Sequence, residues 1–180
     1  MYKRLYHGTN AIFDKFDPAF LNIEKSVDQY GSGFYFYDSI APTIRFGDNV
    51  VFADCHIKKI LDINKSHKYK LTRDQVETLI IQSPILDDCL TNFGDIENES
   101  FDKILNCAVN TYQDMDMLYT LNVIGNDFFR GKYTSILLKK FIELTGINCF
   151  QKKFIDLSIF VMLDANDIEI VKTVPFSQVN

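Results

Sequence analysis

The stretch Gly31-Ser32-Gly33-Phe34-Tyr35-Phe36-Tyr37 places two glycines directly before four consecutive aromatic residues. Glycine permits a positive φ and a close approach of two backbones, and aromatic residues favour a half-buried, pleated strand. Side chains alternate along a strand, so Phe34 and Phe36 should share one face and Tyr35 and Tyr37 the other. The stretch therefore predicts a tight turn that enters a strand. Two interpretations fit it: an aromatic core strand, or a strand that offers flat rings to a pocket.

Length and composition indicate one globular domain over residues 1–180. Hydrophobic residues make up 47% of the chain and charged residues 24%, which is typical of a folded protein and excludes disorder of the whole chain. A chain of 180 residues is long enough to bury a sizeable core. The formal net charge of −5 argues against a broad nucleic-acid-binding surface, because phosphate binding needs an excess of Lys and Arg.

The cysteines predict free thiols and no metal centre. Cys55, Cys89, Cys107 and Cys149 lack the C-x-x-C spacing of zinc sites, and free thiols fit a reducing compartment. No apolar run approaches the roughly 18 residues of a membrane span, and the first residues do not resemble a signal peptide. We therefore expect no metal or membrane partner and a cytoplasmic location, which includes the cytoplasm of a host cell after delivery.

The sequence predicts strands at both ends of the chain and helices in the middle. We expect strands over residues 2–7, 34–37, 50–57, 60–63, 147–150, 157–163 and 168–174, and helices over 41–46, 73–82, 101–113 and 133–144. Ser39, Thr72 and Ser100 are the expected N-caps, and Gln75 completes a capping box with Thr72. This order is typical of an α+β fold whose N- and C-terminal strands share one sheet.

A set of short motifs, in this order along the chain, resembles the ADP-ribosyltransferase superfamily. The motifs are His7-Gly8-Thr9, Gly33-Phe34-Tyr35-Phe36, Thr43 with Phe46, and the strand Phe160-Val161-Met162-Leu163-Asp164. The set is most similar to the diphtheria-toxin and poly(ADP-ribose) polymerase branch, which has a His-Tyr-Glu signature. The resemblance covers residues 3–46 and 146–172. It implies an ADP-ribosyltransferase-like α+β fold, with central antiparallel β-sheets and a helical insertion in the middle of the chain.

The resemblance implies that NAD is the co-substrate and that its nicotinamide leaves as the ribose C1′ becomes an oxocarbenium-like electrophile. The backbone of Gly8 and the hydroxyl of Thr43 would then pair with the carboxamide. Tyr35 and Phe46 would sandwich the nicotinamide ring. In the alternative interpretation Thr43 and Phe46 are ordinary helix residues and Tyr35 is a tyrosine of the sheet face.

The resemblance also implies that the two early motifs meet at one slot. His7 would hydrogen-bond the adenosine ribose as a binding group rather than a proton shuttle, and Thr9 would touch the same ribose. Gly33 and Phe34 belong to the strand that carries Tyr35, and they complete the implied NAD-binding set. We expect the imidazole of His7 and the phenol of Tyr35 to border a single groove. The alternative for His7 is a structural hydrogen-bonding residue at the end of a strand.

An isoleucine occupies the position of the family's catalytic glutamate. That glutamate directly precedes the aromatic residue of the late strand, so aligning Phe160 places Ile159 at the glutamate position. His7, Tyr35 and Ile159 are therefore the residues at the three catalytic signature positions. Isoleucine cannot hydrogen-bond a ribose hydroxyl or stabilise a positively charged ribosyl centre. Some members that transfer a single ADP-ribose resemble this pattern, and in them the acceptor carboxylate assists.

Three interpretations of Ile159 are open: substrate-assisted transfer of one ADP-ribose, replacement of the glutamate by another residue, or an inactive NAD-binding domain. Gln151 and Asp156 are the candidate substitutes, because both lie in or beside the loop before the late strand. Ser158 should face away from Ile159 on a regular strand. For each candidate the alternative is an ordinary solvated loop residue.

The sequence therefore predicts an NAD-dependent mono-ADP-ribosyltransferase that modifies a macromolecular acceptor, a protein or a nucleic acid, with a protein favoured. Two alternatives are an NAD glycohydrolase, with water as the acceptor, and a catalytically degenerate module that binds NAD, ADP-ribose or a protein partner. A fourth interpretation is an α+β domain whose motif matches are due to chance. A small chain of this type resembles bacterial effectors, toxins and phage proteins, which is an analogy only.

Overall fold

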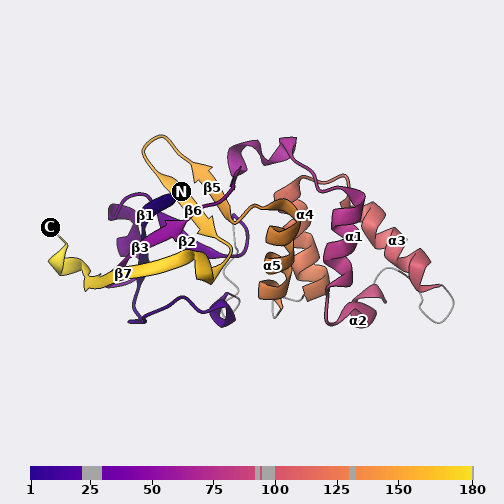
Figure 1. Ribbon diagram of the computed structural model, residues 1–180, viewed down its shortest axis with the longest axis horizontal. Helices are drawn as coiled ribbons and strands as arrows, with labels where there is room; N and C mark the ends of the chain where they lie inside the picture. The colour runs from indigo at the N-terminus through magenta and orange to yellow at the C-terminus, as the bar shows by residue number, and fades with distance from the viewer. Residues whose placement is uncertain (22–29, 92–93, 95–99, 130–132, 180) are drawn as a thin grey trace.

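The computed structural model of the protein describes residues 1–21, 30–91, 94, 100–129 and 133–179. It is an α+β structure with a seven-stranded mixed sheet, and five α-helices occur in the described part of the chain. Figure 1 shows the strands gathered at one end of the molecule and helices α1–α5 at the other. The helices come from the middle of the sequence, so the sheet is built from the two ends of the chain.

The sheet has the strand order β4-β5-β6-β2-β1-β3-β7. The strands are β1 Tyr2–Thr9, β2 Phe34–Tyr37, β3 Asn49–His56, β4 Ile60–Asp62, β5 Cys149–Lys153, β6 Ser158–Met162 and β7 Ile168–Pro175. The prediction that the N- and C-terminal strands share one sheet is confirmed. The expectation of purely antiparallel pairing needs one correction, since β4 pairs with β5 in parallel. The helical segment between β4 and β5 supplies the long connection that a parallel pair requires.

The helical region contains three helices at the predicted places and two that were not predicted. The helices are α1 Arg73–Ile81, α2 Leu86–Leu90, α3 Phe101–Tyr112, α4 Met117–Ile124 and α5 Thr134–Thr145, and α4 continues into a π-helix, η4, over Gly125–Phe129. Short 3₁₀ helices are η1 Pro18–Phe20, η2 Ala41–Phe46, η3 Ile63–Lys68, η5 Ala165–Asp167 and η6 Phe176–Gln178. α2 has only five residues, and α4 is apolar on several sides, so neither shows a clear amphipathic period.

The predicted caps of α1 and α3 are confirmed. The Thr72 hydroxyl accepts from the backbone N–H of Gln75 at 3.3 Å, and the Gln75 side chain accepts from the backbone N–H of Thr72 at 3.0 Å. The Ser100 hydroxyl accepts from the backbone N–H of Lys103 at 3.4 Å. These bonds satisfy N–H groups that a helix start leaves without partners inside the helix.

The expected cap of the segment after β2 is wrong. Residues 41–46 form the 3₁₀ helix η2, whose N-cap position is occupied by Ile40 rather than Ser39, and no side chain caps it. Thr43 closes this first turn from inside: its backbone N–H and its hydroxyl both donate to the carbonyl of Ile40, at 2.9 and 2.7 Å. A Ser39 cap is therefore not needed to hold the turn.

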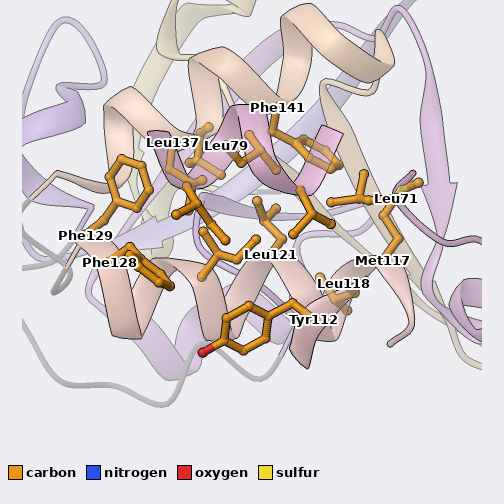
Figure 2. Packing of buried hydrophobic residues seen from close by; sticks show 14 of the residues in the cluster. Leu71, Leu79, Tyr112, Met117, Leu118, Leu121, Phe128, Phe129, Leu137 and Phe141 are labelled. Carbon is orange, nitrogen blue, oxygen red and sulfur yellow. The ribbon is translucent and has the colours of Figure 1, made fainter. Parts of the chain in front are cut away.

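Two hydrophobic clusters lie on opposite faces of the sheet. The larger cluster joins the helices to one face of the sheet, and Figure 2 shows its helical part, where Leu79, Leu121, Leu137 and Phe141 are in close packing. The smaller cluster covers the other face and includes Phe16 from the loop after β1. The sheet thus separates two hydrophobic cores and contributes side chains to both.

The strand β2 contributes to both clusters, as its alternation predicts. Phe34 and Phe36 belong to the smaller cluster, whereas Tyr37 belongs to the larger cluster and Tyr35 packs against it. The predicted bounds of this strand, Phe34–Tyr37, are also those of the structure. The aromatic core strand is therefore real, and its tyrosines lie on the side of the helices.

A buried polar network fastens the start of β5 to the turn between β3 and β4. The side chain of Asn148 is fully buried, and its oxygen accepts from the backbone N–H groups of Lys58 at 2.9 Å and Lys59 at 3.3 Å. Its amide nitrogen donates to the His56 carbonyl and to the Asp167 carboxylate, both at 2.8 Å. The Lys58 ammonium lies 2.8 Å from the same carboxylate. One amide thus satisfies four polar groups.

We expect Asn148→Ala to lower the free energy of unfolding by about 2–3 kcal/mol, because the Lys58 and Lys59 N–H groups and the His56 carbonyl lose their side-chain partner and the buried Asp167 carboxylate keeps only its ion-pair partners. The matched control is Asn166→Ala, whose side-chain amide bonds only the Asp164 carboxylate in an exposed turn. Asn166→Ala should lower the free energy of unfolding by no more than about 0.5 kcal/mol. Urea denaturation of both variants measures the difference, and equal costs would contradict the role assigned to Asn148.

Candidate functional site

The strands that carry the early and late motifs are neighbours in the sheet. β2 lies between β1 and β6, and Tyr37 is paired with Tyr6 on one side and with Ile159 on the other. Residues directly opposite one another in a sheet project from the same face. Tyr6, Tyr37 and Ile159 therefore form a row across three strands, on the face that bears the larger cluster.

Gly8 is required by the close approach of η2. A Cβ atom at residue 8 would lie 2.0 Å from the Thr43 carbonyl oxygen and 3.1 Å from the Phe46 Cβ. The predicted close backbone approach at Gly8 is therefore present, and η2 of the same chain makes it. Thr43 is fully buried, and its hydroxyl hydrogen is used by the Ile40 carbonyl, so the oxygen offers a ligand only an acceptor.

Phe46 stacks on Tyr37. The ring centroids of Tyr37 and Phe46 are 5.7 Å apart with an interplanar angle of 26°, and Phe46 is 53% exposed. The Tyr35 hydroxyl instead donates to the Gly31 carbonyl at 2.8 Å and accepts from the Tyr30 backbone N–H at 3.2 Å. These bonds hold the Tyr35 ring against the turn before β2, and the expected nicotinamide sandwich between Tyr35 and Phe46 stays a prediction.

His7 lies on the opposite face of the sheet from the tyrosines. Its ring packs against Phe16 and Phe36, at centroid distances of 5.3 and 5.7 Å, within the smaller cluster. The link to β2 is a hydrogen bond of 2.8 Å between His7 Nδ1 and the Tyr35 carbonyl. The imidazole of His7 and the phenol of Tyr35 thus do not border one groove from the same side, because β1 presents His7 and Leu5 to one face and Tyr6 to the other.

The surroundings of His7 favour a neutral imidazole. Burial lowers the pKa of His7 from its ordinary value of 6.5, and the bond to the Tyr35 carbonyl opposes this in part. A carbonyl can only accept, so Nδ1 carries the proton, and in the neutral ring Nε2 then carries a lone pair. His7 is therefore suited to accept a hydrogen bond from a ligand hydroxyl at Nε2.

The pairing of β1 with β2 stops at Tyr6. His7, Gly8 and Thr9 pair with β3 on one side, but β2 pairs with β1 only through Tyr6 and Tyr37. The Thr9 hydroxyl accepts from the Ala11 backbone N–H at 3.0 Å and so closes a turn. β1 and β2 therefore separate at His7-Gly8-Thr9. The hydrogen bond between the His7 side chain and the Tyr35 carbonyl bridges this separation.

Ile159 lies at the meeting point of the strands, but its candidate substitutes do not lie there. Ile159 is 8% exposed and faces the larger cluster beside Tyr37. Gln151 is paired with Phe160, so it projects from the other face of the sheet. Asp156 lies in the exposed connection between β5 and β6. The structure therefore brings neither substitute to the side of Ile159.

Gly33 and Phe34 have packing roles. A Cβ atom at Gly33 would lie 2.5 Å from the Val161 side chain and 2.7 Å from the Met162 carbonyl, so β6 requires the glycine. Phe34 is buried in the smaller cluster. Their implied part in NAD binding stays a prediction.

Tyr37 belongs to the candidate site, although the sequence motifs did not include it. The alternation of the aromatic run already placed Tyr37 on the face of Tyr35, but only the pairing register shows that Tyr37 is opposite both Tyr6 and Ile159. Burial raises the pKa of Tyr37, and the nearby Tyr30 adds to this effect. Its phenol is accordingly neutral at physiological pH.

Comparisons with known proteins leave the family open. No family model and no curated protein matches the chain. A solved structure titled "Crystal structure of an anti-CRISPR protein" aligns with 95% of this chain and 96% of its own, with a TM-score of 0.38 and 10% identity. Within the described ranges, no cluster of side chains is suited to bind a metal ion, and no helix has the length and apolar character to cross a membrane.

Gly8→Ala should destabilise the protein by about 1–3 kcal/mol, because the new Cβ overlaps the Thr43 carbonyl and η2 must move. The matched control is Gly125→Ala in η4, where the nearest atom to a new Cβ is a flexible Leu137 methyl at 3.3 Å. Alanine favours a helix over glycine by roughly 1 kcal/mol, so the control should be neutral or stabilising. Chemical denaturation checks both, and a tolerated Gly8→Ala would contradict the packing of η2.

His7 should make the protein less stable as the pH falls below about 6.5. The folded pKa lies below the unfolded value, so on acidification the unfolded chain binds the proton first and stability falls until the folded pKa is passed. His7→Gln removes this contribution. Urea denaturation at pH 7.5 and pH 5 should show a larger loss for the wild type than for His7→Gln, and equal losses would contradict a buried neutral imidazole.

Proposed function

We propose that the protein is an NAD-dependent mono-ADP-ribosyltransferase that modifies a macromolecular acceptor. The observation that carries this proposal is the meeting of the motif segments. β1, β2 and β6 are adjacent, η2 packs on Gly8, and Tyr37 is paired with both the first and the last of these strands. Motifs from opposite ends of the sequence, which individually have little specificity, thus converge in space.

In the proposed complex, the nicotinamide end of NAD lies at the separation between β1 and β2. Phe46 is covered by Tyr37 on one side and is half exposed, so its ring can stack on a nicotinamide. The main chain at Gly8 suits a carboxamide, which has both donors and an acceptor, whereas the fully buried Thr43 oxygen would reach it only after a shift of η2. The ring pair of the site is thus Phe46 and Tyr37, with Tyr35 supporting the turn.

His7 acts from the other side of this separation. Its neutral ring is anchored through Nδ1 to the Tyr35 carbonyl, and Nε2 can accept from a ribose hydroxyl. A ligand that passes between β1 and β2 meets the imidazole on one face of the sheet and the Phe46 ring on the other. The position of His7 opposite the tyrosines is compatible with NAD binding only in this arrangement.

The identity of residue 159 favours transfer of a single ADP-ribose. Chain elongation would require a group that activates a ribose hydroxyl of the growing polymer, and an isoleucine side chain has no such group. The same residue supports a second candidate function, a catalytically silent module that binds NAD or ADP-ribose. NAD hydrolysis is a third outcome of the same chemistry, with water in place of the acceptor.

The test is incubation of the purified protein with NAD labelled in the adenylate and with a cell lysate. We expect nicotinamide release together with label on macromolecules. Nicotinamide release without macromolecular label would replace the proposal by NAD hydrolysis, and NAD binding without turnover would replace it by a binding module. If calorimetry shows no NAD binding and the assay shows no turnover, NAD recognition is overturned altogether.

The site variant for this test is Phe46→Ala, and its control is Ile44→Ala. Both side chains are exposed on η2, at 53% and 58%, but only Phe46 stacks on Tyr37. Loss of one stacking ring should weaken NAD binding by about 3- to 10-fold, whereas Ile44→Ala should leave it unchanged. Equal effects of the two variants would remove Phe46 from the proposed site.

A further inference from the structure

A lysine lies directly across the sheet from Ile159. β5 and β6 are antiparallel, and Lys152 is paired with Ile159. Residues opposite one another project from the same face with Cβ atoms about 4.5–5.5 Å apart. Phe150, two residues before Lys152 on β5, belongs to the same cluster as Ile159, which confirms the shared face. The position that holds a glutamate in the resembling family therefore has a lysine as its direct cross-strand neighbour.

The charge of Lys152 is not neutralised within the described part of the chain. Lys152 is partly buried, and its neighbours on this face, Phe150 and Ile159, are apolar. Other lysines of the protein do form ion pairs, for example Lys58 with Asp167 and Lys140 with Glu143. A partly buried cation among apolar neighbours favours the binding of an anion.

The proposed transfer reaction also favours an acceptor that is already an anion. The bond between the ribose C1′ and the nicotinamide nitrogen breaks, and its electron pair leaves with nicotinamide. A carboxylate oxygen then forms the new bond to C1′ with its own electron pair, so the products are nicotinamide and an ADP-ribosyl ester. No proton is released. A hydroxyl group or water would have to lose a proton to a base, and Ile159 is not a base.

We propose that Lys152 binds the carboxylate of the acceptor and positions it for attack, so that the protein selects acidic side chains. This inference rests on the proposed function. A lone ammonium would oppose the positive charge that develops on the ribose, whereas a carboxylate held between the two is attracted by both. Lys152 is thus an acceptor-binding residue that discourages reaction with water.

The pyrophosphate of NAD is an anion as well. The experiment therefore distinguishes binding of the acceptor carboxylate by Lys152 from binding of this pyrophosphate. Wild type, Lys152→Met and Lys153→Met are compared. Lys153 is the matched control, since it is the next residue of β5, is exposed and is paired with Ser158 on the other face. Circular dichroism and thermal unfolding of the three proteins establish that all are folded. Calorimetry then gives the NAD affinity, and labelling of a lysate gives the rate and the linkage of transfer.

We expect Lys152→Met to lower the rate of transfer about 10- to 100-fold with unchanged NAD affinity, and Lys153→Met to change neither. The label should map to Asp and Glu by mass spectrometry and should be released by neutral hydroxylamine, which cleaves esters. A loss of NAD affinity in Lys152→Met would assign the lysine to the pyrophosphate and overturn the inference.

Two further outcomes separate this inference from the proposed function. Label on side chains other than Asp and Glu, or equal rates for Lys152→Met and the wild type, would overturn the role of Lys152 and leave the transferase intact. A wild-type protein without transfer would overturn the proposed function and with it the inference. A Lys152→Met variant that gains nicotinamide release without label would support the exclusion of water.

Discussion

The pairing of Tyr37 with Tyr6 and with Ile159 is the contact on which the arrangement depends. β2 is only four residues long, yet it joins β1 from the start of the chain to β6 from near its end. Strand pairs of such sequence separation carry a large loop-closure cost, so they need burial on both faces to persist. β2 has that burial, since Phe36 lies in the smaller cluster and Tyr37 in the larger. The site and the two cores are therefore stabilised by the same short strand.

This division of faces explains why few side chains are free to act on a ligand. Alternate residues of β2, β3 and β6 are committed to the smaller cluster, and the helices cover part of the other face. What remains near Gly8 is main chain, the η2 rings and the far nitrogen of His7. Such a set suits a flat ring that carries a carboxamide, because rings and main-chain groups supply stacking and hydrogen bonds. The close packing of η2 on Gly8 makes this set rigid.

Local signals predicted the fold where they were strong. The alternating aromatics predicted β2, and the capping residues Thr72 and Ser100 predicted the starts of α1 and α3, because these features depend only on neighbours in sequence. The candidate site was harder to predict because it depends on register and on side-chain hydrogen bonds. Nothing local indicates that the Tyr35 hydroxyl is held by Gly31, that Phe46 therefore meets Tyr37, or that Gln151 faces away from Ile159. The structure consequently shows the α+β class, whereas the functional site is a proposal.

For the proposed transferase, the identity of residue 159 constrains the chemistry more than any other side chain of the candidate site. Ile159 and its two cross-strand neighbours, Tyr37 and Lys152, carry no carboxylate, and burial raises the pKa of Tyr37, so its phenol is a poor base at neutral pH. His7 is neutral but lies on the opposite face, with one nitrogen engaged by the Tyr35 carbonyl. In the proposed transferase, an anionic acceptor would supply both the nucleophile and negative charge beside the ribosyl cation, and the nearest described carboxylate of the chain, Asp38, is engaged by the backbone N–H of Ser158 at 3.0 Å. Under the proposed function, an apolar residue at position 159 would be compatible with activity, because the acceptor itself would complete the site.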